Sequence, residues 1–298
     1  MFVKKKMDRL YESIEKDRIV FDDRSQYVFM SDLHRGDNSA GDEFGQNRHI
    51  YYHALQYYFH DGFTYVEAGD GDELWETVHY EYIRSSHAEI FQLLKKFNDD
   101  NRLIMIYGNH NIQISDPEYV KKNMTNNFDE FLDREVEILP GLKPVEAVVM
   151  EYEKTGQEIF VCHGHQGQLL NDQLWFISFV FCRFFWRYLH RLGFNYAANP
   201  AKNRYKRAKM EKAMSKWLET KGNLMLICGH THRSRLPQPG QPRYFNIGCG
   251  IHPRGITCIE IVFGEIALVS WSMHARRDGM LYIKRTVIKG PIELEKFI

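Results

Sequence analysis

Five short polar segments of the chain carry side chains that commonly bind metal ions. Each one follows an apolar, strand-like run, and together they offer carboxylate, imidazole and amide groups but no thiolate. Such a ligand set suits hard to borderline divalent metals, namely manganese, iron or zinc. The segments are Asp32-Leu33-His34, Gly69-Asp70, Gly108-Asn109-His110, His163-Gly164-His165 and Gly229-His230-Thr231-His232.

The elements around the first three segments suggest how these side chains meet. Strand-like runs at 27–30, 63–66 and 103–107 alternate with helical patterns over 47–60 and 85–98, which predicts a layered α/β fold. Ligands in open α/β sheets gather at the carboxyl ends of strands, so we expect the segments to converge. In an extended segment, residues two apart point to the same side, so D-x-H and H-x-H each aim two side chains at one cluster.

Downstream, the pattern predicts two strands, a long helical stretch, another strand and a β-rich tail. These cover about 145–152, 158–162, 168–220, 224–227 and the residues from 243 on. The tail is punctuated by turns, as a second sheet packed on the first would be.

Composition narrows the classes of function. Lysine plus arginine and aspartate plus glutamate number 39 each, so the formal net charge is zero. A neutral chain has no general attraction to nucleic acid, which counts against a nuclease and predicts no nucleic-acid partner.

Cysteines and apolar stretches bear on location. The five cysteines are scattered without a C-x-x-C pair, which argues against disulfides or a thiolate zinc site and for a reducing compartment. No apolar core follows the N-terminal lysines, and the longest strongly apolar stretch, Leu174 to Cys182, is nine residues. A membrane-spanning helix needs about 20 apolar residues, so we expect a cytoplasmic protein.

The five segments, in this order, resemble the motifs D-x-H, G-D, G-N-H, H and G-H-x-H of the calcineurin-like metallophosphoesterase superfamily. The resemblance implies a site for two divalent ions, most readily manganese, with iron or zinc as alternatives, and hydrolysis of a phosphate ester by a hydroxide held between them. It implies Asp32, His34 and His232 as ligands of one ion, Asn109, His163 and His230 as ligands of the other, and Asp70 as the bridge.

We therefore expect an α/β fold, built as a layered α/β/β/α sandwich of two packed mixed sheets flanked by helices. The whole chain, 1–298, is expected to form a single metallophosphoesterase domain. The helical stretch 168–220 is expected as an insert within it, with a lid as one interpretation.

The chemistry also needs a proton for the leaving alkoxide, and His110 is placed beside Asn109 to supply it. The superfamily usually carries Asp or Glu after G-N-H, where this chain has Asn111, so we expect a less basic His110. Asp72 and Glu73 follow the expected bridge closely. They are candidates for hydrogen-bond partners of the ligand histidines, or they form a solvated acidic turn.

Four further residues are candidates for substrate contacts. Arg35 and Arg233 each follow a motif, and a guanidinium group matches the geometry of phosphate oxygens, although either is equally compatible with a surface arginine. The other two candidates are Trp75 and His165.

Within the superfamily, the chain is most similar to the UDP-2,3-diacylglucosamine hydrolases, as an outlying relative. The likeness rests on the acidic-aromatic cluster Glu73-Leu74-Trp75-Glu76 and on the helical insert. That group carries G-N-R-D where this chain has Gly108-Asn109-His110-Asn111, and its insert binds acyl chains.

The insert combines aromatic residues between 175 and 188 with a basic run between 202 and 216. This composition fits a lid over an acyl chain or a helix that contacts anionic lipid at the inner face of a membrane. It also fits a core helix followed by a solvated basic helix, or a dimer contact.

These observations favour a hydrolase, specifically a metal-dependent phosphoesterase acting on a small or lipid-linked phosphate ester or pyrophosphate. A cyclic-nucleotide phosphodiesterase or a nuclease is the alternative enzyme. A scaffold that has the fold without the chemistry is the alternative from another class.

Overall fold

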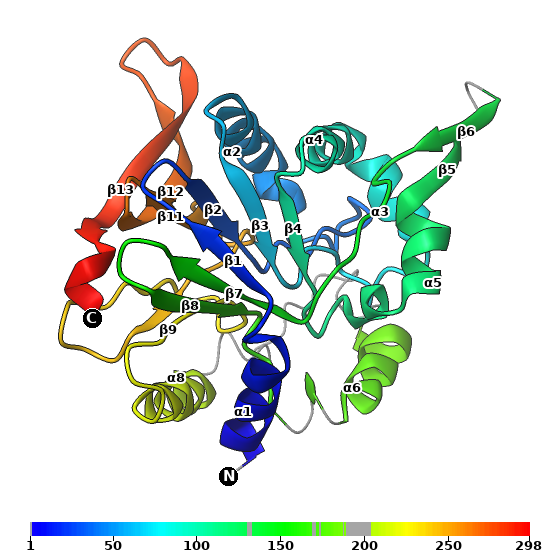
Figure 1. The fold of residues 1–298 in the computed structure, drawn as a ribbon. Coiled ribbons are helices and arrows are strands. Elements are labelled where there is room, and N and C mark those ends of the chain that lie inside the picture. Colours follow the sequence, from blue (N-terminus) through cyan, green and yellow to red (C-terminus); the bar gives the residue numbers. More distant parts are fainter. Residues whose placement is uncertain (1, 130–132, 169–170, 173, 187, 189–203) are drawn as a thin grey trace.

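The computed structural model describes all residues except 1, 130–132, 169–170, 173, 187 and 189–203. Two mixed β-sheets pack face to face, and helices cover their outer sides (Figure 1). The expected α/β sandwich is therefore confirmed.

The larger sheet has six strands in the order β13-β12-β11-β2-β3-β4. The central strands are short apolar runs that are buried on both faces, as parallel strands between two layers require. Strands β2, β3 and β4 are parallel, and β11, β12 and β13 continue the sheet in antiparallel fashion. The bounds are β2 Gln26–Met30, β3 Thr64–Ala68, β4 Leu103–Ile106, β11 Ile256–Val262, β12 Glu265–Ala275 and β13 Leu281–Glu293.

The smaller sheet has five strands in the order β1-β7-β8-β9-β10. Strands β8, β9 and β10 are parallel, so β8 and β9 end at the same edge of this sheet. The bounds are β1 Arg18–Phe21, β7 Ala147–Tyr152, β8 Gln157–Cys162, β9 Met225–Cys228 and β10 Tyr244–Asn246.

The expectation that the β-rich tail forms the second sheet is wrong. Only β10 joins the smaller sheet, whereas β11, β12 and β13 extend the sheet that already contains β2. The reason is long-range pairing: β11 lies beside β2, with Ile259 opposite Phe29, and gives β2 its second neighbour. Strand β1, absent from the sequence-based prediction, starts the smaller sheet.

Three apolar clusters hold the layers together. One lies between the sheets and includes Phe29 and Ile227. The second packs the six-stranded sheet against α2 (Arg48–His60) and α4 (Ala88–Asp99). The third packs the five-stranded sheet against α1 (Phe2–Ile14) and α8 (Arg204–Leu218). This order of layers places both sheets at the centre of the molecule.

The remaining elements are short and lie mostly in the connections. The helical pattern predicted over 85–98 divides into α3 and α4, and the stretch predicted over 168–220 gives α6, η5 and α8, with 169–170, 173, 187 and 189–203 outside the described residues. The bounds are η1 Gly45–Asn47, α3 Tyr80–Ser86, η2 Ile112–Ser115, α5 Pro117–Val120, η3 Lys121–Thr125, β5 Asn126–Asp129, β6 Arg134–Glu137, α6 Trp175–Phe181, η5 Cys182–Trp186 and η6 Leu294–Phe297.

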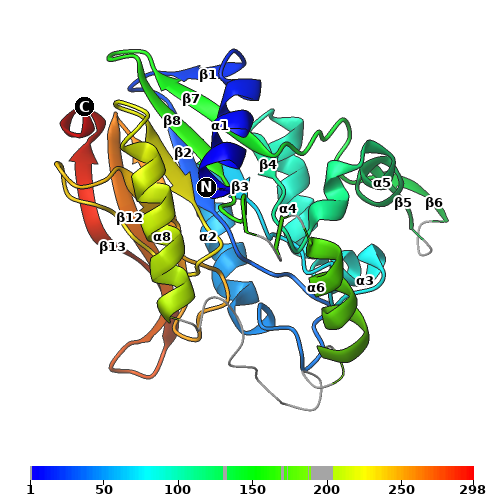
Figure 2. The ribbon, with the colours of Figure 1, turned by 90° about the horizontal axis from the view of Figure 1, so that it is seen from below.

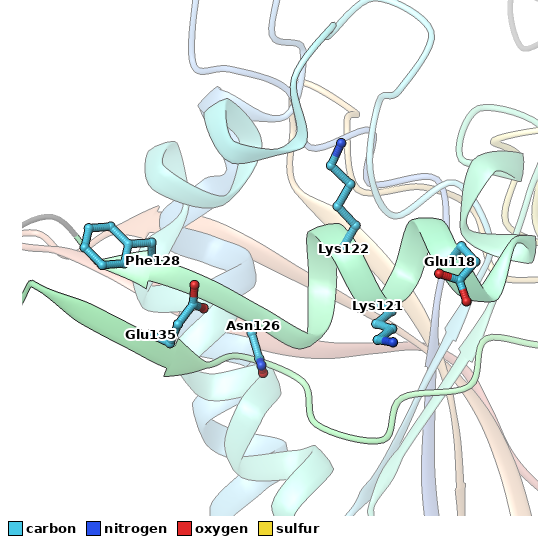
Figure 3. A pocket seen from close by; sticks show the side chains of 6 residues that line it. All are labelled: Glu118, Lys121, Lys122, Asn126, Phe128 and Glu135. Atoms are coloured by element: carbon cyan, nitrogen blue, oxygen red, sulfur yellow. The ribbon is translucent and has the colours of Figure 1, made fainter.

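Strands β5 and β6 form a hairpin that projects from the body (Figure 1). A pocket at its base is lined by side chains of mixed charge, including Lys121, Lys122 and Glu135 (Figure 3). It contains none of the motif residues.

In the described part of the chain, no helix combines the length and the apolar character that crossing a bilayer requires.

Candidate metal centre

The seven expected ligands all follow the carboxyl ends of strands. Four of them come from the six-stranded sheet: Asp32 and His34 after β2, Asp70 after β3 and Asn109 after β4. The other three come from the five-stranded sheet: His163 after β8, and His230 and His232 after β9. The ends of five strands in two sheets therefore supply the ligand-type side chains.

Six of these side chains, all except Asn109, form two neighbouring groups. The ligand atoms of Asp32, His34 and His232 lie within 4.8 Å of one another, and so do those of Asp70, His163 and His230. Asp70 Oδ2 lies 3.0 Å from His163 Nε2 and 4.0 Å from His34 Nε2. This carboxylate therefore lies between the two groups.

Buried polar atoms without partners indicate that the site is built for cations. Among the described residues, Asp32 Oδ1, Asn109 Oδ1 and His163 Nε2 are buried and make no hydrogen bond. Such atoms are costly unless something else satisfies them. Asp32 Oδ1 lies only 3.0 Å from His232 Nε2 without the geometry of a hydrogen bond, as expected of two ligands facing a common ion. The donor set fits divalent metals.

In two of these side chains, the polar atom that faces away from the centre is hydrogen-bonded within the chain. His163 Nδ1 lies 3.1 Å from the carbonyl of Ala68, which leaves the lone pair on Nε2. Asp32 Oδ2 accepts hydrogen bonds from Ser31 Oγ at 2.7 Å and from the His230 amide at 2.8 Å. Both ligands are thus oriented so that one atom, His163 Nε2 or Asp32 Oδ1, remains for the centre.

The backbone at the ligands differs from the extended conformation assumed from the sequence. Asp32, His34, Asp70, His230 and His232 have φ between 49° and 64°, in the left-handed region that non-glycine residues rarely adopt. Each costs on the order of 1 kcal/mol or more, and such strain typically gathers at functional sites. Alternation along an extended segment is therefore not what aims these side chains together.

Two motif glycines allow the ligand loops to approach closely. A Cβ on Gly69 would lie 2.4 Å from His163 Nδ1, and one on Gly229 would lie 2.3 Å from Asp32 Oδ2. Neither distance leaves room for a side chain. The glycines in G-D and G-H-T-H are thus required for packing ligands from different sheets against one another.

The local charges suit bound cations. Burial raises the pKa of the Asp32 carboxyl, but the neighbouring His232 and His163 outweigh it and bring this pKa to about 2. Burial and repulsion from His163 lower the pKa of His230 to about 3, which keeps its lone pair available. Burial lowers the pKa of His34, but Glu73 and Asp70 together raise it to about 10. The carboxylates thus favour positive charge at this place, which a metal ion would supply.

Glu73, not Asn111, is the side chain that contacts the His110 ring. Glu73 Oε2 lies 2.7 Å from His110 Nδ1 and 2.8 Å from His34 Nδ1. The Asn111 amide oxygen instead accepts a hydrogen bond from Gly108 N. Asp72 contacts no ligand histidine and pairs with Arg35.

Trp75 and His165 lie beside the centre but are buried. The Trp75 ring stacks on His110 with ring centroids 4.2 Å apart. His165 lies against His163 and His230, and burial together with the charge of His163 lowers the pKa of His165 well below its ordinary value. Both therefore support neighbouring imidazoles in this structure, and a substrate contact for either stays a prediction.

The prediction that Arg35 contacts phosphate is wrong. Its side chain is fully buried, and the guanidinium group bonds Glu67 at 2.7 Å and 2.8 Å and Asp72 at 2.7 Å. Arg35 thus ties the loop after β2 to β3 and to the loop that follows it. Arg233 is largely exposed and lies 3.9 Å from Glu211, so its contact with substrate also stays a prediction.

A contact between the insert and this site was not predicted from the sequence. Arg183 in η5 donates hydrogen bonds to the carbonyls of Leu74 and Trp75 and lies over the Phe179 ring. The same loop carries Glu73, so the insert is fixed to the segment that holds His110. No sequence motif predicts that an arginine side chain donates hydrogen bonds to backbone carbonyls.

Comparisons with known proteins add little. No family model matches the chain, and no curated protein matches it. Among solved structures, it is similar to a cold-active protein tyrosine phosphatase, with 12% identity and a TM-score of 0.43 over 90% of this chain and 82% of that one. The cold-active protein-tyrosine phosphatase of a psychrophilic Shewanella species gives 10% identity and a TM-score of 0.42, over 92% and 84% of the chains. Vps29 of Chaetomium thermophilum gives 8% identity and a TM-score of 0.35, over 91% and 100%. Identities and TM-scores this low carry no argument about function.

The buried ion network leads to a stability prediction. Replacing Arg35 by Met leaves Glu67 and Asp72 without their counter-charge and should lower the free energy of unfolding by about 3–5 kcal/mol. Arg18→Met is the matched control, because Arg18 pairs with Glu151 and Glu158 at a partly exposed position and should cost less than about 1 kcal/mol. Denaturant unfolding of both variants measures the difference, and equal losses would contradict a special role for the buried network.

Proposed function

We propose that the chain is a two-metal phosphoester hydrolase of the calcineurin-like metallophosphoesterase type. The observation that carries the proposal is the convergence of ligand-type side chains in two groups, each with one buried, unpartnered atom, Asp32 Oδ1 in one and His163 Nε2 in the other, and with Asp70 between them. Asp32, His34 and His232 would hold one ion, and Asn109, His163 and His230 the other, with Asp70 shared. The motif order supports the same division.

Two divalent ions in such a site supply an activated water and positive charge against the phosphate oxygens. The hydrogen bonds of the chain itself determine which carboxylate oxygens remain available to an ion. Because Asp32 Oδ2 is already bonded to Ser31 and to the His230 amide, only Oδ1 remains for an ion. Asp70 Oδ1 is likewise bonded to the His110 amide at 2.8 Å, so Oδ2 is the oxygen that would be available to metal.

His110 is the proposed general acid. Its Nδ1 is bonded to Glu73 and its ring rests on Trp75, so Nε2 is the atom that remains for the leaving group. The side chain is a quarter exposed, more than that of His34 or His232, and can therefore meet a substrate. His34, Asp70 and His110 also form a group within 4.8 Å, so service as a metal ligand is the rival role for His110.

For the substrate we propose a small or lipid-linked phosphate ester or pyrophosphate. Nothing among the comparisons favours the UDP-2,3-diacylglucosamine hydrolases, and that narrower relation stays a prediction. A panel with manganese separates the alternatives: p-nitrophenyl phosphate, its bis-ester, cyclic nucleotides and a UDP-sugar lipid. A scaffold without chemistry would turn over none of them.

Asp70→Asn tests the shared carboxylate. Loss of the charge between the two ion positions should lower turnover of p-nitrophenyl phosphate at least about a hundredfold, since metal ions supply several kcal/mol of transition-state stabilisation. It should also weaken binding of manganese, measured by calorimetry. Asp99→Asn is the control, because Asp99 is exposed on α4 and pairs with Lys95.

If Asp70→Asn keeps the rate of the unaltered chain, the shared role is refuted. If it loses turnover but binds manganese as before, Asp70 acts without bridging the ions.

His110→Ala tests the acid. It should slow hydrolysis of alkyl phosphates by about 10²–10⁴-fold, because a poor leaving group needs the proton. Hydrolysis of p-nitrophenyl phosphate should change little, since p-nitrophenolate is stable without protonation. Glu73→Gln should show the same leaving-group dependence in weaker form.

Manganese content of the His110→Ala protein decides between the two roles. If the variant keeps its manganese and slows only on alkyl phosphates, His110 acts as the acid. Loss of metal together with equal losses on both substrates would make His110 a ligand.

A further inference from the structure

A cluster of exposed apolar side chains lies on the insert. No residue of α6 or η5 is buried, although most of them are large and apolar. Phe176, Phe181, Phe184 and Phe185 are all more than half exposed. An apolar patch of this kind on a water-exposed helix marks a contact with a partner or a membrane.

Lysines on two other helices lie at the same end of the molecule. Figure 1 places the start of α1, α6 and α8 in the lower part of the molecule, and Figure 2, seen from below, shows α8 beside α1 with α6 separate from both. The exposed lysines there are Lys4 and Lys5 on α1 and Lys209, Lys212 and Lys216 on α8. Helices α1 and α8 pack on one another, so their lysines form one basic region, here called the α1/α8 basic region.

We propose that the α6–η5 aromatic surface inserts into the boundary of an anionic lipid bilayer, while the α1/α8 basic region contacts the lipid headgroups. Aromatic and apolar side chains enter the headgroup boundary, and nearby lysines are attracted to anionic lipid. Together they describe a surface that lies on a membrane without crossing it.

Charge selects a bilayer over a second copy of the chain. A symmetric dimer built on this end would bring each α1/α8 basic region toward the same lysines of the partner, which costs energy. An anionic bilayer is a continuous sheet of opposite charge, so all the lysines meet it favourably at once.

The docking surface is tied to the candidate metal centre. Arg183, within η5, bonds the carbonyls of Leu74 and Trp75, and the Trp75 ring stacks on His110. Bilayer contact therefore places the membrane surface beside the proposed site. The docking itself does not depend on the proposed hydrolase activity.

The test is co-sedimentation of the full chain with vesicles. One set contains phosphatidylcholine alone, and the other contains equal parts of phosphatidylcholine and phosphatidylglycerol. We expect binding to the mixed vesicles, and weaker binding as salt rises from about 0.1 M to about 1 M, where the Debye length falls from about 10 Å to about 3 Å.

Two variants and a control locate the surface. The double variant Phe176→Ser/Phe184→Ser should lower partitioning at least tenfold, since burying each ring contributes on the order of a tenfold change. Lys209→Gln/Lys212→Gln should lower it roughly fivefold for each lysine. Phe263→Ser is the matched control: Phe263 is 71% exposed against 70% for Phe184, and it lies in the β11–β12 turn near the start of β2.

Turnover of p-nitrophenyl phosphate and the circular dichroism spectrum verify that the variants fold. Equal binding to neutral vesicles, binding retained by the phenylalanine variant, or equal loss in Phe263→Ser would each overturn the proposal. So would a dimer in sedimentation that Phe176→Ser/Phe184→Ser dissociates, with no vesicle binding, because a second copy would then cover the surface. Binding is measured without any reaction, so an inactive protein that still docks refutes only the proposed function.

Discussion

The structure depends on concentrating negative charge and imidazole lone pairs where two sheets meet. Asp32 and Asp70 are buried ionised carboxylates, and neither is neutralised by an arginine or a lysine in the described contacts. Isolated buried charge of this kind is unfavourable unless positive charge balances it. The surrounding features follow from this requirement: glycines that let loops approach, left-handed backbone at five ligands, and hydrogen bonds that leave one atom of Asp32, of Asp70 and of His163 for the centre.

The same region shows how the protein treats its other buried charges. Arg35 donates hydrogen bonds to both Glu67 and Asp72, just behind the ligand loops, and the hydroxyls of Tyr65 and Tyr80 donate one further hydrogen bond to each carboxylate. The network joins the loop after β2 to the loop after β3, whose amides and carbonyls are also bonded, as between His34 N and Asp70 O at 2.9 Å. Glu67 and Asp72 thus have their partners within the chain, whereas Asp32 and Asp70 remain available to cations. That contrast is the physical basis for assigning the second set to metal.

Parts of this arrangement could be predicted from the sequence because their signals are local. Apolar runs that end in polar residues gave the strand ends, and the pattern over 47–60 matched α2 closely. Features that depend on contacts between residues far apart in the sequence were not predicted. The pairing of β11 with β2, the burial of Arg35 and the contact of Glu73 with His110 depend on neighbours supplied by other strands. A left-handed conformation at Asp32 or His34 leaves no mark in the residue type, since the fold imposes it.

The sequence alone also did not decide whether the aromatic insert lies in the core or on the surface. An aromatic run at helical spacing reads equally as core or as surface, and only exposure separates the two. The structure places Phe184 and its neighbours in solvent, while Arg183 among them holds the loop of Trp75. The insert therefore joins an apolar surface to the segment that positions His110.

Anomalous diffraction from crystals soaked in manganese tests the central claim most directly. The account predicts two peaks about 3.5–4 Å apart, one beside Asp32 and His232, the other beside Asn109 and His163, with Asp70 between them. A map without a peak among these residues, or with a single ion bound elsewhere, would contradict it.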